Sequence, residues 1–271
     1  MMNFGNHKTG LILLAFLMLA GCGEYEKILK SNDYPVKYEK AMEYYNAEEY
    51  VKSATLFDQV ANIYRGTTKA DTVKYYQAMS YYNQRDYILA GHYFNELATT
   101  YSNSEYLEES EFMSAYCYYK LSPRPSLDQE ATFNAIGALK MYMVRYPNSS
   151  RVSECKALIA ELSDKIVEKS YNSAKLYYDL GYYKSAVIAL RNSLSEYPET
   201  QYREDLMYLI LRSSFLLADN SVASKKRERM QSTADEYLSF KSEFPESRYT
   251  KEAEKIYSNV QNHLETTITN N

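Results

Sequence analysis

One segment of this chain occurs three times at an interval of 37 residues and a fourth time further along the sequence. Residues 37–50 read KYEKAMEYYNAEEY and residues 74–87 read KYYQAMSYYNQRDY, and the two align without a gap. A third copy, EFMSAYCYYK, begins another 37 residues on at Glu111, and a fourth, SYNSAKLYYDLGYY, spans residues 170–183. Self-similarity at a fixed period of this length is typical of a helical solenoid, in which each repeat buries its apolar face against its neighbours.

Two small-residue positions in each copy predict a pair of packed helices. In the first half an alanine is followed three residues later by a tyrosine, which is helix spacing. These pairs are Ala41 and Tyr44, Ala78 and Tyr81, Ala115 and Tyr118, and Ala174 and Tyr177. In the second half a small residue precedes a Phe or Leu by four: Ser53 and Phe57, Ala90 and Phe94, Ala135 and Leu139, and Ala186 and Leu190. The small residue lets two helices approach closely, and the larger one fills the space beside it.

This pattern resembles the tetratricopeptide repeat, which has small residues, aromatic residues and a terminal proline at corresponding positions. The chain departs from it in its period of 37 and in having no Trp, although it has 31 Tyr and 9 Phe. We predict an all-α, tetratricopeptide-like α-solenoid of about five helix pairs plus a C-terminal capping helix. The helices are expected at roughly residues 35–47, 50–64, 70–83, 86–101, 105–121, 128–146, 150–179, 182–197, 201–218, 224–244 and 248–264.

A short motif marks the seams between the predicted helix pairs. It reads YSNSEY from Tyr101, YPNSSR from Tyr146, YPETQY from Tyr197 and FPESRY from Phe244. The aromatic residue closes one helix, and a following proline cannot continue it. The hydroxyl residue then stands where an N-cap is expected, which predicts caps at Ser104, Ser149, Thr200 and Ser247. We assign residues 35–146 to N-terminal repeats and 147–264 to C-terminal repeats with the capping helix, and we expect a disordered tail at 265–271.

The N-terminus has the features of a lipoprotein signal peptide. An apolar run, LILLAFLMLA, is about half as long as a membrane-spanning helix and ends in LAGC, which resembles the bacterial lipobox. We therefore expect residues 1–21 to be removed, Cys22 to carry acyl chains, and residues 22–34 to form a lipidated linker. The resemblance, with Gly23 after the cysteine, points to the outer membrane. An ordinary secretory signal with an incidental cysteine is the alternative.

The later half of the chain resembles the BamD family, the lipoproteins of the outer-membrane β-barrel assembly machine. The resemblance lies in residues 145–206, with a PNS motif, a long helix ending in Y-x-x-A-x-x-Y-Y, and a second helix closing on YP. It implies a non-enzymatic scaffold at the periplasmic face of the outer membrane. C-terminal repeats would hold the POTRA domains of a BamA-like barrel protein, and N-terminal repeats would receive unfolded outer-membrane protein precursors. The resemblance assigns no individual partner-contacting residue.

The repeat geometry offers candidate peptide-binding residues independently of this resemblance. The residue after each packing tyrosine points to the face lined by the first helices, which selects Tyr45, Tyr82, Tyr119 and Tyr178, with Asn46 and Asn83 adjacent. Hydroxyl and amide groups can pair with an extended backbone while the rings pack on aromatic side chains, which suits the end of a β-barrel strand. A second interpretation is that these tyrosines only pack neighbouring repeats.

Several other functions find little support in the sequence. The net charge of −4 does not suit a nucleic-acid backbone. His92 and His263 are far apart, catalytic and metal-binding motifs are missing, and no cofactor is expected. Cys117 and Cys155 could form a disulfide in an oxidising periplasm, but their helical context favours buried thiols. Two rival functions remain, namely glycan capture for an outer-membrane importer and coordination of cell-wall synthesis.

Overall fold

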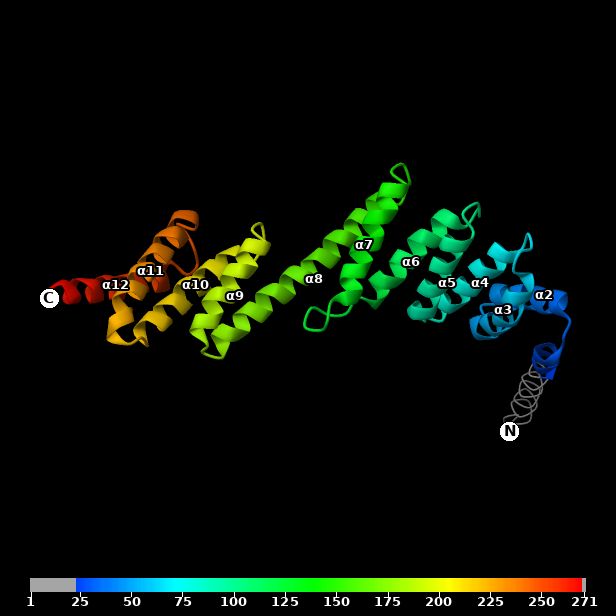
Figure 1. Cartoon of the computed structure of the whole chain (residues 1–271), viewed down its shortest axis with the longest axis horizontal. Coiled ribbons are helices and arrows are strands. Elements are labelled where there is room, and N and C mark those ends of the chain that lie inside the picture. Colours follow the sequence, from blue (N-terminus) through cyan, green and yellow to red (C-terminus); the bar gives the residue numbers. More distant parts are fainter. Residues whose placement is uncertain (1–22, 270–271) are drawn as a thin grey trace, which may run out of the picture. The chain divides into compact units, whose positions relative to one another are not determined.

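The computed structural model describes residues 23–269, with side chains for residues 23–265, and these residues form helices joined by short turns without any β-strand (Figure 1). The helices are α2 (Tyr34–Asn46), α3 (Tyr50–Tyr64), α4 (Ala70–Asn83), α5 (Tyr87–Thr100), α6 (Leu107–Leu121), α7 (Glu130–Arg145), α8 (Val152–Asp179), α9 (Tyr183–Glu196), α10 (Arg203–Asp219), α11 (Ala223–Glu243) and α12 (Thr250–Thr269). Their bounds lie within about two residues of most expected ones, and the all-α tetratricopeptide-like fold is confirmed.

The chain divides into two compact units, and the division falls inside the long helix α8. Unit 1 consists of the described residues up to Pro123 together with Gln129–Leu162, and unit 2 consists of Arg124–Asp128 and the described residues from Ser163 onward. The division therefore lies further along the chain than the expected boundary after residue 146. The reason is that the first half of α8 packs in unit 1, through Cys155 and Leu162, whereas Ala174 in its second half packs in unit 2.

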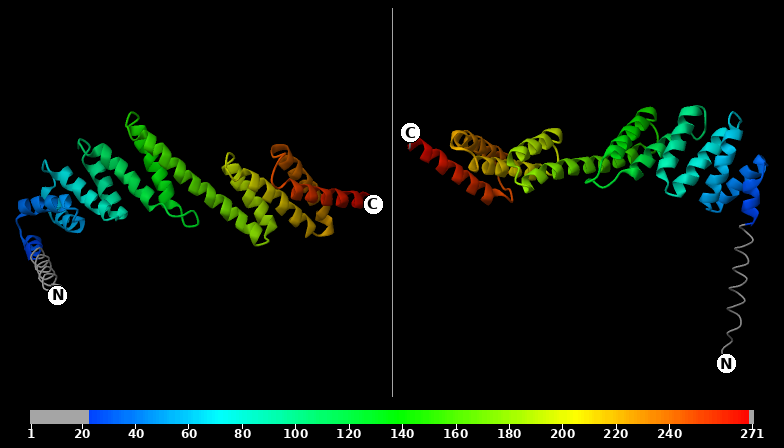
Figure 2. Two further views of the ribbon diagram at one scale, coloured as in Figure 1. Left: turned by 180° about the vertical axis from the view of Figure 1, so that it is seen from behind. Right: turned by 60° about the horizontal axis from the view of Figure 1, so that its bottom comes forward.

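The repeated small and large residues form the core of each unit, as the sequence predicts. Ala41, Ala78 and Ala115 in the first helices of unit 1 are fully buried. The small and large residues of the second helices are fully buried as well: Ser53, Ala90, Ala135 and Ala186, with Phe57, Phe94, Leu139 and Leu190. Successive helices of each unit lie antiparallel and side by side (Figures 1 and 2). The 37-residue repeat is thus a packing repeat.

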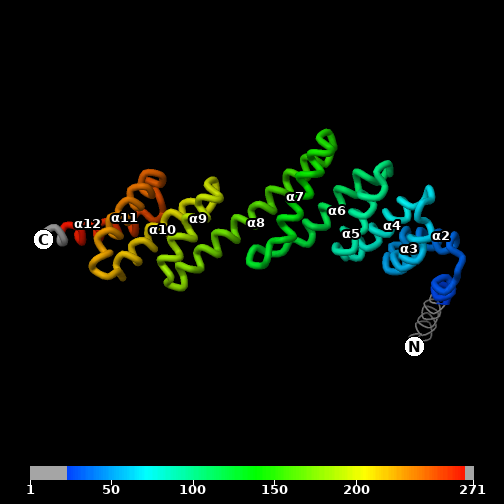
Figure 3. Tube along the Cα trace, in the orientation of Figure 1, coloured from blue at the N-terminus to red at the C-terminus, as the bar shows by residue number. Residues whose placement is uncertain are grey.

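The two ends of the described chain are more ordered than expected. Residues 23–30 are helical, and Tyr25, Ile28 and Leu29 pack on the core cluster around Leu56 and Phe57. Most of the predicted linker 22–34 is therefore a packed helix, because its apolar side chains find a surface on the first repeat. At the other end, α12 (labelled in Figure 3) continues to Thr269 instead of ending at residue 264, so the expected tail is largely helical backbone (Figure 1).

The seams between helix pairs differ from the predicted capping arrangement. The N-caps of α6 and α10 are Tyr106 and Tyr202, and neither helix has a side-chain cap. Ser104 and Thr200 instead accept a hydrogen bond from the amide two residues later, at 3.1 and 3.2 Å. Ser149 and Ser247 accept the equivalent bonds from Arg151 and Tyr249. The prediction of N-caps at these four residues is therefore wrong, because one further turn of chain separates each hydroxyl from its helix.

At three seams the same hydroxyl also binds the preceding helix pair. Ser104 donates a hydrogen bond to Asp71 at 2.7 Å, Ser149 to Glu108 at 2.7 Å, and Ser247 to Glu204 at 2.6 Å. At all four seams, the residue two positions after the hydroxyl residue covers an aromatic ring of the preceding helix pair. Tyr106 stacks on Tyr75 at 4.3 Å between ring centroids, Tyr202 on Tyr171 at 4.3 Å, and Tyr249 on Tyr208 at 3.9 Å, while the Arg151 guanidinium lies 4.0 Å from the Phe112 centroid. The motif thus fastens each helix pair to the one before it.

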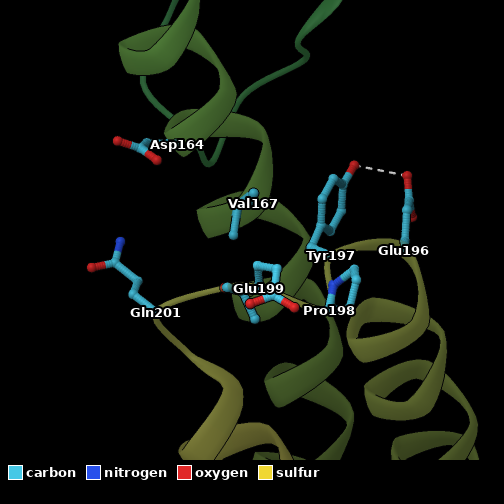
Figure 4. A pocket seen from close by; sticks show the side chains of 8 residues that line it. Asp164, Val167, Glu196, Tyr197, Pro198, Glu199 and Gln201 are labelled. Atoms are coloured by element: carbon cyan, nitrogen blue, oxygen red, sulfur yellow. Dashed lines mark hydrogen bonds between the residues drawn. The ribbon is translucent and has the colours of Figure 1, made fainter.

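The seam at Thr200 lacks the acidic acceptor. Asp71, Glu108 and Glu204 each stand four residues before the stacked ring, and Val167 takes that place before Tyr171. A hollow of about 530 Å³ adjoins this seam, lined by Val167 and the chain from Glu196 to Gln201 (Figure 4). Stacking of Tyr202 on Tyr171 remains at this seam, but the hydroxyl-to-carboxylate bond is lost.

Candidate protein-binding face

The predicted tyrosines lie at equivalent places at the ends of the first helices. Tyr45, Tyr82 and Tyr119 occupy the last turns of α2, α4 and α6 in unit 1, and each is half-buried. The adjacent Asn46 is exposed, whereas Asn83 is half-buried and interacts with Tyr45. These five residues define what we call the tyrosine face of unit 1.

Rings of the next repeat contact two of these tyrosines. Tyr45 meets Tyr76 edge-on, with 4.9 Å between ring centroids, and Tyr82 lies 6.4 Å from Tyr116. Each of them also touches the first residue of its own second helix, Tyr50 or Tyr87, at 5.6 Å. Tyr45 and Tyr82 therefore pack neighbouring repeats, as the second interpretation of the sequence holds, while leaving part of each ring accessible.

Sequence analysis missed Tyr76 and Tyr116 as members of this aromatic cluster. Neither is repeated at 37 residues, since Met113 and Met79 occupy the corresponding positions. The search for recurring residues therefore passed over both. Only the placement of one first helix beside the next brings their rings onto Tyr45 and Tyr82.

Tyr119 is held differently, by an acidic residue of α8. Its hydroxyl donates a 2.8 Å hydrogen bond to Glu161, and its ring stacks on Tyr116 at 5.3 Å. The Lys120 ammonium lies 4.9 Å from the Tyr116 centroid and 5.6 Å from that of Tyr119, which suits a cation–π interaction. This end of the tyrosine face is therefore fixed by charge as well as by ring contacts.

The environment of the tyrosine face keeps its hydroxyls protonated. Burial raises the pKa of Tyr82 to about 12, and it raises the pKa of Tyr45 as well. The hydrogen bond to Glu161, followed by burial, raises the pKa of Tyr119 to about 12. At neutral pH these groups are hydrogen-bond donors on apolar rings, a chemistry that fits peptide recognition and offers no base or nucleophile.

The fourth candidate, Tyr178, belongs to unit 2 and lies in a separate setting. Its ring is 6.2 Å from Tyr183, and the Arg212 guanidinium lies 5.9 Å from its centroid. Burial raises the pKa of Tyr178. Tyr178 therefore has an arginine, Arg212, as its cationic neighbour.

Lipidation at Cys22 stays a prediction, because that residue lies outside the described part of the chain. Within residues 23–269, no helix is both long and apolar enough to cross a bilayer. The described residues also contain no cluster of His, Cys, Asp and Glu suited to a metal ion. Cys117 and Cys155 are buried and free, so the structure has the thiol form that their helical context favours.

Comparison with known proteins places the chain in a family. The family model YfiO, described as outer membrane lipoprotein and corresponding to the BamD lipoproteins, matches residues 31–229 of the 271. No match is found among curated protein sequences. Among solved structures, the TPR2AB-domain:pHSP90 complex of yeast Sti1 has a TM-score of 0.38 and 13% identity, covering 84% of this chain and 98% of that one. From the match over residues 31–229, we conclude that this chain belongs to the YfiO family of outer membrane lipoproteins.

Proposed function

We propose that this chain is a lipid-anchored, non-enzymatic scaffold of the outer-membrane β-barrel assembly machine, located at the periplasmic face. Its C-terminal repeats would hold the POTRA domains of a BamA-like barrel protein, and its N-terminal repeats would bind unfolded outer-membrane protein precursors. The observation that carries this proposal is the family match, which runs from before α2 into α11.

The tyrosine face supports a role in binding extended polypeptides. Half-buried rings at the ends of successive first helices combine apolar surface with hydroxyl donors, and exposed Asn46 adds an amide that can pair with a backbone. Because Tyr45 and Tyr82 are already held by neighbouring rings, they lose little side-chain freedom when a ligand binds.

Cys22 supplies the proposed membrane attachment. Several acyl chains on one residue give stable anchoring, whereas a single chain binds membranes only marginally. We predict that Cys22→Ala moves the protein from the membrane fraction to the soluble periplasm. Unchanged fractionation of this variant would rule out acylation as its main tether.

The binding proposal can be tested by extraction and by site-specific cross-linking. The tagged chain, extracted in mild detergent, should bring down one abundant β-barrel protein with tandem periplasmic domains. A photo-cross-linker at Asn46 should also capture unfolded barrel precursors. The matched control is Asn62, which is also exposed and lies on the second helix of the same pair.

Two results would overturn the proposal. One is recovery of peptidoglycan enzymes or a glycan importer without the barrel protein, which would favour cell-wall coordination or glycan capture. The other is equal cross-linking of precursors at Asn46 and Asn62, since a specific face must distinguish the two positions.

A further inference from the structure

A second surface emerges from comparing three repeats of unit 1 at one position. Tyr44, Tyr81 and Tyr118 are separated by 37 residues and stand at equivalent places on α2, α4 and α6. In the first repeat, Tyr44 meets Tyr25 edge-on at 5.6 Å, and the Lys52 ammonium lies 5.0 Å from the Tyr44 centroid. Tyr25 comes from helical residues 23–30, which precede the repeats. A segment outside the repeats thus supplies the ring that covers this position.

In the second repeat, the ring that covers the equivalent tyrosine comes from the repeat itself. Tyr93 of α5 stacks on Tyr81 with 5.4 Å between centroids, and the Lys74 ammonium lies 4.9 Å from the Tyr93 centroid. Lys74 also pairs with Glu96, and the Tyr81 hydroxyl donates to Asp58 at 2.7 Å. Both occupied positions therefore combine a tyrosine, a second aromatic ring and a cation.

The third repeat lacks the second ring. Alignment of Ala90 with Ala135 in the buried cores of α5 and α7 puts Ala138 where Tyr93 stands in the preceding repeat. Tyr118 is 40% exposed, and no ring contact or hydrogen bond to it is found within the described residues. Because Ala138 has no ring, the space that the Tyr93 ring fills in the preceding repeat is left open here.

A hollow occupies that space. It has a volume of about 240 Å³, and its lining includes Asn95, Glu111, Ser114, Tyr118, Ala138 and Met141. These six residues correspond in the second repeat to Asp58, Lys74, Gln77, Tyr81, Tyr93 and Glu96. The hollow is therefore the counterpart of the filled site with the ring absent. Asn95 and Met141 replace two carboxylates there, and Glu111 stands at the position of Lys74.

The electrostatics of the hollow also suit an aromatic ring. Arg145 lines it and forms an ion pair with Glu111, leaving the arginine side chain 58% exposed. A cation in the wall complements the negative face of a ring, as Lys74 does for Tyr93. Exposed apolar side chains lie in or near the hollow. Met141 in its lining is 64% exposed, Val144, which precedes the lining residue Arg145 on α7, is 78% exposed, and Ile88, at 70%, lines an adjoining hollow that shares Tyr118.

We propose that this hollow between α5 and α7 is a binding pocket for an aromatic side chain of a partner polypeptide. A polypeptide is the expected source because the first repeat already receives Tyr25 from a separate helical segment, and because the exposed apolar rim can contact residues next to the inserted ring. The proposal concerns a different surface from the tyrosine face and does not depend on which partner binds there.

The first test uses p-cresol, which reproduces the tyrosine side chain. Binding to the full chain is followed by NMR of methyl-labelled alanine and methionine, and the Ala138 and Met141 methyl signals should shift. N-acetyl-tyrosinamide should compete with p-cresol at least about tenfold better than N-acetyl-leucinamide does. A probe that shifts neither methyl group, or equal competition by leucine, would overturn the proposal.

The second test fills the pocket from within. Ala138→Tyr restores the residue found in the preceding repeat and should weaken p-cresol binding at least about tenfold. The control Lys140→Tyr adds a tyrosine at an exposed position of the same helix and should bind like the wild type. Ala138→Leu serves as a smaller filling variant if circular dichroism reveals that Ala138→Tyr misfolds. Wild-type binding by the folded filled variants would refute the assignment.

The polypeptide source is tested in cells with a photo-cross-linker at Val144. Cross-links to a polypeptide should form in the otherwise wild-type chain and in the Lys140→Tyr control, and they should disappear when Ala138→Tyr fills the pocket. Cross-links that persist in the filled variant, or p-cresol binding without any polypeptide cross-link, would contradict a partner side chain as the occupant.

Discussion

Tyr142 provides a test of how the seams stabilise the fold. It is 2% exposed, and its hydroxyl donates a 3.0 Å hydrogen bond to Glu108 and lies 2.8 Å from the Ser149 hydroxyl. Tyr142→Phe keeps the buried ring and removes only this hydroxyl. Because a hydrogen bond to a charged group contributes about 1.5–3 kcal/mol and Glu108 faces solvent, we expect a loss of about 1–2 kcal/mol in the free energy of unfolding at pH 7.

The effect of this substitution should shrink at alkaline pH. Burial raises the pKa of Tyr142 to about 12, with a further rise from its bond to Glu108, whereas the bond with Ser149 opposes the shift. Since the folded state holds the proton more tightly, the corresponding stability is fully present below the unfolded pKa of about 10 and is lost as the pH rises towards 12. A rise in the pKa of Tyr142 from about 10 to about 12 corresponds to about 2.7 kcal/mol, which we discount to about 1–2 kcal/mol for solvent screening.

Urea unfolding followed by circular dichroism at pH 7, 9, 10.5 and 11.5 measures this difference. Wild type should exceed Tyr142→Phe by about 1–2 kcal/mol at pH 7, and the two should converge near pH 11.5. Tyr118→Phe is the control, because it removes a partly exposed hydroxyl without a hydrogen bond to any described residue, and it should match wild type at pH 7. A constant difference between wild type and Tyr142→Phe across this pH range would refute the reasoning.

Two further predictions concern buried thiols and the seams of unit 2. Burial raises the pKa of Cys117 to about 12, so iodoacetamide at pH 8 should label it only after urea unfolding, and mass spectrometry would detect earlier labelling. Ser247→Ala removes a hydroxyl that donates to Glu204 and accepts from an amide, and we expect a loss of about 1.5 kcal/mol. Thr200→Ala removes only the amide contact and should cost about 0.5–1 kcal/mol by the same urea assay, and equal losses would argue against the acidic acceptor as the difference.

The repeat pattern predicted the helices well because their determinants are local. The positions of Ala78, Ala90 and Phe94 hold small and large residues at helix spacing in each copy, and these three residues are fully buried. Errors occurred where a side chain has a partner distant in sequence. Ser104 was expected to cap its own helix. Its hydroxyl instead donates a hydrogen bond to Asp71 of the preceding helix pair and accepts one from the backbone amide of Tyr106.

The two candidate surfaces could be predicted to different extents. The position of Tyr45 and Tyr82 follows from the repeat, but their contacts with Tyr76 and Tyr116 do not, because those rings interrupt the 37-residue pattern. The hollow at Tyr118 went unnoticed because an alanine in a helix carries no signal by itself. The hollow can be recognised only by comparing two repeats: Tyr93 covers Tyr81 in one, whereas Ala138 faces the equivalent Tyr118 in the next.

The sequence by itself determined that this chain is a series of paired helices, since the spacing of small and large apolar residues fixes which side of each helix is buried. The tertiary structure alone decided which of the 31 tyrosines are enclosed and which remain available to a partner. All of these side chains have the same chemistry, and their exposure depends on neighbours contributed by other helices.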